Sequence, residues 1–257
     1  MSKRWSSEEK EQLRELFLEK QLPIAEISSL LGRTPASVNN GLTNFGIPRR
    51  RSLPKFRMPQ RMTPVLARVH AHVCGDGYVY VRRERDDYGY LKEYRQGYFR
   101  YRYGFAYTNL NPKLIGSFMA DVQEVFNLKP RYDPKRWTAY VKSKDAWELL
   151  TGLGAGKSRH WRVDREITKG SGSIKAAWLK AFFDDEAHFD PAGRIRVRSV
   201  NRPGLEQAAL MLRQFVPCHI TPLKGLYPDD SCYLVVPSSA RDRFLRLIGS
   251  TKFNGAS

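Results

Sequence analysis

Two similar nine-residue stretches decide the fold, VHAHVCGDG at residues 69–77 and LKAFFDDEA at residues 179–187. Each is an apolar segment that ends in an acid and has alanine at its third position. Small side chains spaced four residues apart allow two helices to approach closely. Gly75 completes this spacing in the first stretch, whereas Asp185 replaces the second small residue in the other. The pattern predicts two helices packed along each other, with the contact at Asp185 left open.

The order helix, two strands, helix, two strands, helix is predicted twice along the chain. The first stretch is followed by strands at 77–83 and 98–108, a helix at 112–126, strand residues at 137–142 and a helix at 146–153. The second is followed by strand residues at 194–199, a helix at 203–216, strand residues at 233–236 and a helix at 240–248. This order predicts an α+β domain at 62–257 with two pseudo-symmetric αββαββα halves, at about 62–168 and 173–254.

Alternating side chains predict a basic face on each sheet. Aromatic residues alternate with Arg100 and Arg102 in one strand, and apolar residues alternate with Arg194, Arg196 and Arg198 in another. Because successive side chains of a strand point to opposite faces, each sheet would have one face for its helices and one for an acidic ligand. The stretch at 82–97 between the first two strands reads as a long hairpin tip, which either extends a DNA footprint or is only a charged loop.

Residues 1–47 predict a small all-α domain of helix-turn-helix type. Ser6 and Glu9 have capping-box spacing, and Thr34 with Pro35 marks the start of a third helix after a tight turn. A helix after such a turn is typical of helix-turn-helix modules, whose last helix enters the major groove. The outward positions that would face bases include Ser37, Asn39 and Asn40. The alternative is a three-helix cap without a ligand.

Residues 48–61 are predicted to form a basic linker. Three prolines interrupt this segment, and its six cations are Arg49, Arg50, Arg51, Lys55, Arg57 and Arg61. Proline favours extended chain, so the segment suits binding along a phosphate backbone. The alternative is a solvated tether.

Composition favours a polyanionic partner. The chain carries 44 Lys and Arg against 26 Asp and Glu, a formal net charge of +18, and 41% of its residues are hydrophobic. Such a positive charge favours binding to a polyanion, either a nucleic acid or an anionic membrane surface. No stretch approaches the roughly 20 apolar residues of a membrane span. The three scattered cysteines, Cys74, Cys218 and Cys232, predict an intracellular, reducing location without a structural zinc site. A microbial cytoplasm or nucleoid, or an organelle, fits this prediction.

The two nonapeptides, with their matching downstream elements, resemble the LAGLIDADG family of homing endonucleases in its single-chain, two-motif form. The resemblance covers roughly residues 62–254 and implies a homing-endonuclease fold whose two sheets form a saddle across the DNA major groove. It implies a metal-dependent double-strand endonuclease that uses Mg²⁺ or Mn²⁺, with Asp76 and Glu186 as catalytic acids. Lys157 and Lys252 would be the basic residues near the cut phosphates, and Gly75 and Asp185 would complete the metal site.

An acid at a helix C-terminus opposes the helix dipole, so its presence in both motifs favours a catalytic role. The neighbouring Asp184 and Asp185 are predicted to be solvated or to lie behind the ligands. The alternative function is a non-cleaving DNA-binding regulator or an RNA maturase on the same scaffold, which Asp185 and Ala187 mildly favour. We expect an intron-encoded or free-standing monomer, rather than an intein-embedded enzyme, that acts on a long pseudo-palindromic double-stranded DNA site.

Overall fold

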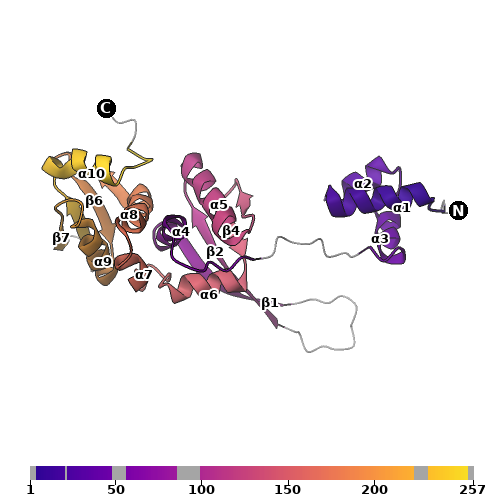
Figure 1. Cartoon of the computed structure of the whole chain (residues 1–257), viewed down its shortest axis with the longest axis horizontal. Coiled ribbons are helices and arrows are strands. Elements are labelled where there is room, and N and C mark those ends of the chain that lie inside the picture. The colour runs from indigo at the N-terminus through magenta and orange to yellow at the C-terminus, as the bar shows by residue number, and fades with distance from the viewer. Residues whose placement is uncertain (1–3, 21, 48–55, 86–98, 223–230, 254–257) are drawn as a thin grey trace. The chain divides into compact units, whose positions relative to one another are not determined.

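A computed structural model describes residues 4–20, 22–47, 56–85, 99–222 and 231–253. The chain divides into two compact units, Met1–Lys55 and Phe56–Ser257, each with its own core (Figure 1). The end of the predicted linker packs onto the second unit. The Phe56 ring stacks on Phe126 at 5.8 Å, and the Arg57 N–H donates to the Phe126 carbonyl at 2.9 Å. The second unit therefore begins at Phe56, within the segment predicted as linker.

The first unit contains three α-helices, α1 (Ser7–Arg14), α2 (Ile24–Leu30) and α3 (Pro35–Asn44), and a π-helical turn (Glu15–Glu19) that continues α1. The predicted capping box is present, because the Ser6 hydroxyl accepts from the Glu9 N–H and the Glu9 carboxylate accepts from the Ser6 N–H. The Thr34 hydroxyl caps α3 by accepting from the Ser37 N–H. Sequence reasoning missed the π-helical turn.

Apolar residues of all three helices form the core of this unit. Leu13, Ile27 and Val38 are fully buried. Gly32, at φ +57°, makes the left-handed turn between α2 and α3 that glycine adopts without strain. Leu30 is 61% exposed, because the buried side of α2 is centred between Ile27 and Ser28.

The second unit contains the predicted αββαββα order twice. The first half consists of α4 (Pro64–Cys74), β1 (Gly77–Arg85), β2 (Phe99–Thr108), α5 (Pro112–Phe126), β3 (Arg131–Asp133), β4 (Thr138–Lys142) and α6 (Lys144–Gly152). The second consists of α8 (Gly172–Glu186), β5 (Ala187–Phe189), β6 (Ile195–Ser199), α9 (Arg202–Leu212), β7 (His219–Pro222), β8 (Cys232–Val236) and α10 (Arg241–Leu247), with a 3-10 turn (Ser238–Ala240) before α10. The short helix α7 (Arg165–Thr168) lies between the halves in sequence. The predicted fold class is confirmed.

Each half has one antiparallel four-stranded sheet, with strand orders β1-β2-β4-β3 and β5-β6-β8-β7. The register pairs Gly77 with Tyr107 in the first sheet and Ala187 with Val197 in the second, so the motif ends occupy equivalent positions. The strands β1 and β2 pair as far as Arg85 and Phe99, which confirms a hairpin. Its predicted tip falls largely on residues 86–98, outside the described residues.

The motif helices α4 and α8 form the most extensive helix–helix contact in the described part of the chain, and Figure 1 shows them side by side between the two halves. Ala71 and Ala181 are buried, as close packing requires. The Trp178 indole N–H of α8 donates to His70 Nδ1 of α4 at 3.0 Å. Because burial lowers the pKa of His70 to about 4, this histidine is a neutral acceptor. One continuous core spans both halves.

No described helix is long and apolar enough to cross a membrane. The cysteines Cys74, Cys218 and Cys232 are all free, as their scattered spacing predicts.

Trp178→Ala should destabilise the second unit by about 3 to 5 kcal/mol, because it removes a fully buried indole at the junction of the halves and the hydrogen bond that this indole donates to His70 Nδ1. Leu210→Ala is the matched control, since Leu210 is 60% exposed on α9. Its effect should stay within about 0.5 kcal/mol. Chemical denaturation of both variants measures the difference, and similar values would show that the helix pair does not hold the halves together.

Candidate metal and nucleic-acid site

Two acids meet where the motif helices end. Asp76 follows the C-cap of α4, and Glu186 is the last residue of α8. The end of β2 holds Asp76, because the Asn109 amide donates to its carboxylate at 2.9 Å and the Thr108 N–H donates to its carbonyl at 3.3 Å. Asp76 is the more exposed of the two acids, and Glu186 is half-buried. The structure therefore brings both predicted catalytic acids to one end of the helix pair.

Burial and neighbouring carboxylates disfavour the charged forms of both acids. Burial, with the charges of Asp76 and Asp185, raises the pKa of Glu186 to about 7. Partial burial and the charge of Asp185 raise the pKa of Asp76 to about 6, although Lys252 and Asn109 oppose this shift. Crowded carboxylates that resist ionisation are typical of sites that hold a cation.

Asp184 holds the loop that carries Lys252. Its carboxylate accepts from the Ser250 hydroxyl at 2.6 Å, from the N–H groups of Thr251 at 2.7 Å and Lys252 at 3.2 Å, and from the Lys180 ammonium at 2.8 Å. Burial opposes its ionisation, but these hydrogen bonds outweigh burial and lower its pKa. Asp184 therefore lies behind the candidate ligands, the second of the two placements predicted for it, because its buried carboxylate turns inward to this loop.

Lys252 lies beside the acid pair. Its ammonium donates to the Ala187 carbonyl at 2.7 Å and approaches the Asp185 carbonyl at 3.5 Å. Its positive charge partly offsets the rise in the pKa of both Asp76 and Glu186. This loop is well held despite its position near the end of the chain.

Lys157 is placed differently. It is exposed in the loop after α6, and its carbonyl accepts from the N–H groups of His160 and Trp161. It is not among the groups that shift the pKa of Asp76 or Glu186. The structure brings one of the two predicted lysines to the acids and leaves the other apart from them.

Asp185 lies between the motif helices and is fully buried at its side chain. Its carboxylate accepts from the Tyr107 hydroxyl at 2.5 Å and contacts His72 Nδ1 at 3.0 Å. Gly75 of the other helix makes the room, since a Cβ there would lie 2.8 Å from Asp185 Oδ2. Of the placements predicted for Asp185, the structure favours the one behind the ligands, because its buried carboxylate is turned to Tyr107 and His72. The helix contact that the sequence left open is a close one.

The described residues contain no cluster of three or more His, Cys, Asp and Glu side chains that could hold a metal. The donors that the structure brings to the helix ends are two carboxylates, from Asp76 and Glu186. Oxygen donors of this kind suit Mg²⁺ or Mn²⁺, which keep several waters and accept phosphate oxygens as further ligands. The residues present fit such an ion.

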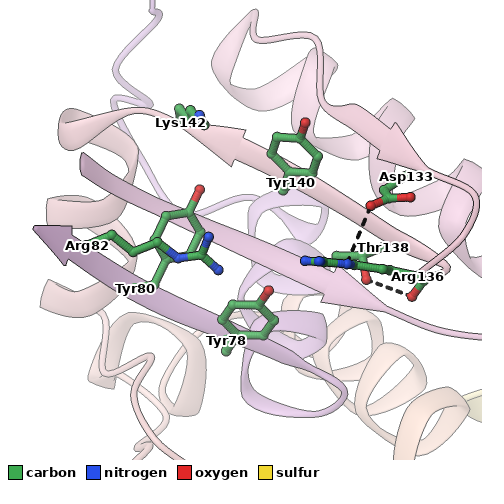
Figure 2. A pocket seen from close by; sticks show the side chains of 8 residues that line it. All are labelled: Tyr78, Tyr80, Arg82, Asp133, Arg136, Thr138, Tyr140 and Lys142. Atoms are coloured by element: carbon green, nitrogen blue, oxygen red, sulfur yellow. Dashed lines mark hydrogen bonds and ion pairs between the residues drawn. The ribbon is translucent and has the colours of Figure 1, made fainter. Parts of the chain in front are cut away.

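The open face of the first sheet carries tyrosines and cations around a small-residue centre. In β2 this face has Gly104 and Ala106, and a Cβ at Gly104 would lie 2.5 Å from the Tyr80 hydroxyl oxygen. Figure 2 shows the resulting hollow, lined by Tyr78, Tyr80, Arg82, Asp133, Arg136, Thr138, Tyr140 and Lys142. Arg102 forms an ion pair with Glu84 at 2.9 Å, and the side chain of Arg100 lies outside the described residues.

The arginines of the second sheet contact neighbouring side chains. Arg194 pairs with Asp190 at 2.7 Å, and Arg196 lies over the Tyr233 ring at 3.8 Å. Arg198 donates to the Ser231 hydroxyl at 3.4 Å. The intervening residues of β6 are buried toward the helices, as the alternation predicts.

The remaining predicted DNA-binding residues lie in the first unit and the segment after it. On α3, Asn40 is exposed, while Ser37 and Asn39 are half-buried. The Asn39 amide donates to the Pro35 carbonyl at 3.1 Å. The Arg57 Nε–H donates to the Val125 carbonyl at 3.4 Å. Arg49, Arg50, Arg51 and Lys55 lie outside the described residues.

Sequence reasoning missed Tyr107, His72 and Asn109 as residues of this site. The available signals were a polar His72 in an otherwise apolar helix face and polar groups at the end of β2. Neither signal names a partner, because Tyr107 and Asp185 are far apart in sequence.

The paired helices, the duplicated sheets and the acids at the helix ends define the homing-endonuclease fold. The sequence matches no protein-family model and no curated protein at a significant level. Solved structures of the homing endonuclease I-DmoI match the fold. Mesophilic variants of I-DmoI align at 17% identity with a TM-score of 0.54, covering 72% of this chain and 95% of that one. The complex of I-DmoI with DNA and Mn aligns at 16% identity with a TM-score of 0.54, covering 72% of this chain and 96% of that one. The complex with DNA and Ca aligns at 17% identity with a TM-score of 0.55, covering 74% of this chain and 91% of that one.

Glu186→Gln should stabilise the metal-free protein at pH 8 by roughly 1 kcal/mol, allowing for solvent screening. The folded-state pKa of Glu186 is raised from 4.5 to about 7. The charged form is therefore disfavoured in the folded state, and stability is lost as the pH rises through about 7. The melting temperature in EDTA should rise by about 2 to 4 °C at pH 8 and by less at pH 5.

Glu206→Gln is the control, because Glu206 is an exposed partner of Arg202 on α9. It should change the melting temperature little at either pH. An unchanged or lower melting temperature for Glu186→Gln at pH 8 would contradict the proposed charge crowding.

Proposed function

We propose that this protein is a site-specific double-stranded DNA endonuclease that hydrolyses phosphodiester bonds with a divalent metal. The observation that carries the proposal is the meeting of Asp76 and Glu186 at the end of the paired motif helices, beside Lys252. Support also comes from the fold, whose solved neighbours include I-DmoI in complex with DNA and Mn.

Asp76, Glu186 and the Gly75 carbonyl would hold Mg²⁺ or Mn²⁺. When bound, such an ion lowers the pKa of a coordinated water and offsets the charge that develops on the phosphate. The carboxylates come from both halves of the chain, so one end of the helix pair would serve both strands of the duplex.

The chain's own groups set up this site. Asn109 orients the Asp76 carboxylate by a hydrogen bond, and the backbone of β2 fixes the Asp76 carbonyl. The Lys252 ammonium, fixed by the Ala187 carbonyl, offsets negative charge beside the acids and would stabilise a charged transition state. Lys157 would need to move toward the acids to act in the same way.

The two open sheet faces would bind the duplex. Arg82 and Lys142 on the first sheet, and Arg196 and Arg198 on the second, provide cations for phosphates or base edges. The helix α3 and the basic segment after it would extend the contact. Two similar but unequal halves suit a monomer on a long, pseudo-palindromic target.

Cleavage should depend on metal and on both acids. A plasmid that carries the protein's own genomic neighbourhood should give a linear product with Mg²⁺ and none with EDTA. Asp76→Asn and Glu186→Gln should each remove at least about 2 to 3 orders of magnitude in rate, the scale of losing a charged group that acts in the transition state. Lys252→Met should slow cleavage more than Lys157→Met. Gel electrophoresis of timed samples measures all four.

Tight, metal-independent binding without cleavage would overturn this proposal. It would leave the alternative of a non-cleaving DNA-binding regulator, and preferential binding of an RNA transcript of the same region would indicate a maturase.

Duplex binding should be salt-dependent through the sheet faces. Arg82→Ala and Lys142→Ala should each lower the slope of log K against log salt by about 1, because each removes one phosphate contact. Lys144→Ala is the control, since Lys144 lies on α6 and pairs with Glu148. Equal slopes for all three variants, measured by fluorescence anisotropy, would exclude this face as the phosphate-binding surface.

A further inference from the structure

Three polar side chains form a buried group where the motif helices end, which we call the Asp185 cluster. It consists of Asp185 of α8, His72 of α4 and Tyr107 of β2. The Tyr107 hydroxyl donates to Asp185 Oδ1 at 2.5 Å, and His72 Nδ1 lies 3.0 Å from Oδ2. The His72 and Tyr107 rings also contact each other, with centroids 4.6 Å apart. All three side chains are nearly or fully buried.

The cluster joins the two halves. Asp185 belongs to the second half, whereas His72 and Tyr107 belong to the first. It also has no copy related by the pseudo-symmetry of the fold. The equivalent positions, from motif alignment and strand register, are Gly75, Phe182 and Val197, which carry no polar side chain.

A packing role alone does not explain this group. A small residue suffices for close helix contact, and Gly75 fills the equivalent position. A buried carboxylate costs free energy unless hydrogen bonds compensate it. Here the compensating groups come from two different elements of the opposite half, so the carboxylate ties the end of α8 to both.

The tie leads directly to the acid pair. Glu186 follows Asp185 in sequence, and Tyr107 is two residues before Asn109, which donates to the Asp76 carboxylate. The adjacent Thr108 N–H donates to the Asp76 carbonyl. Glu186 is thus on α8, the helix that supplies the carboxylate of the cluster. Asp76 is held at the end of β2, the strand that supplies the hydroxyl of the cluster.

We propose that Asp185 is a positioning residue which, through Tyr107 and His72, fixes the spacing of Asp76 and Glu186 for a divalent cation. The inference rests on the proposed function, because it assigns the acid pair to a metal. It predicts that breaking the cluster weakens metal binding more than it weakens the fold.

The test compares melting temperatures of the full chain in EDTA and in millimolar MnCl₂. Ligand that binds only the folded state raises the melting temperature, so the difference reports occupancy of the site without any cleavage. The wild type should show a rise, and a double variant with Asp76→Asn and Glu186→Gln should show none. Tyr107→Phe and Asp185→Asn should each reduce the rise to less than half.

Tyr103→Phe is the matched control. Tyr103 is in the same strand and on the same face of the sheet, four residues before Tyr107, but its ring contacts Trp147 of α6 instead of His72. It should retain the wild-type rise. Asp185→Asn keeps the shape of the side chain, so its result stands if Tyr107→Phe unfolds too readily to be measured.

A lower melting temperature in EDTA with an undiminished Mn²⁺ rise, in both cluster variants, would overturn the proposal and leave a purely structural cluster. A wild type without any Mn²⁺-dependent rise would overturn it as well. Neither outcome decides whether the protein cuts DNA, because plasmid cleavage is measured separately and depends on Asp76 and Glu186.

Discussion

The close pairing of α4 and α8 is the constraint on which the second unit depends. Small residues at Ala71 and Ala181 allow the backbones to approach, and Trp178 and His70 join the helices by a buried hydrogen bond. Each sheet packs on its own motif helix, so this pair makes the two halves one core. The pairing also sets where the helix ends lie, and therefore brings together two acids that are far apart in sequence.

Three carboxylates at the end of α8 differ in their surroundings and hence in what they do. Asp184 accepts hydrogen bonds from the loop of Lys252, which lower its pKa. Asp185 is buried between the helices and held by Tyr107 and His72, and burial raises its pKa. Glu186 reaches the open end of the pair, where burial and neighbouring charges raise its pKa to about 7. The first two hold structure in place, and only the third is available to a ligand from solution.

Much of the fold was predictable because its causes are local. Short stretches of sequence contain the signals for helix caps and strand alternation, and comparing them along the chain gives the repeated order. The two motifs also place Asp76 and Glu186 at equivalent helix ends. The exposure of Leu30 was not predictable from its helix alone, since packing against the other helices decides which side of α2 is buried. The start of the second unit at Phe56 depends on a stacking partner, Phe126, from a later helix.

The site was predictable only where the motifs alone determine it. Asn109, Tyr107 and His72 belong to it because strand register and helix contact bring them to the acids. Asp185 illustrates the same limit. It breaks the small-residue pattern, yet Gly75 opposite gives it the space it needs. An aspartate fits at position 185 only because the facing residue in the other half, Gly75, has no side chain. The second motif alone does not contain this information.

The two halves also differ in how they hold their lysines. The loops that carry Lys157 and Lys252 are similar in sequence. The motif-helix residues at the positions that could bind these loops are different. In the second half Asp184 accepts three hydrogen bonds from residues 250–252. Its counterpart in the first motif is Cys74, which contacts His70 of its own helix. A thiol there cannot offer the charged acceptor that holds a loop, so only Lys252 is fixed beside the acids. The two halves share one scaffold, and single differences between the motifs, such as Cys74 against Asp184, make the two ends of the site unequal.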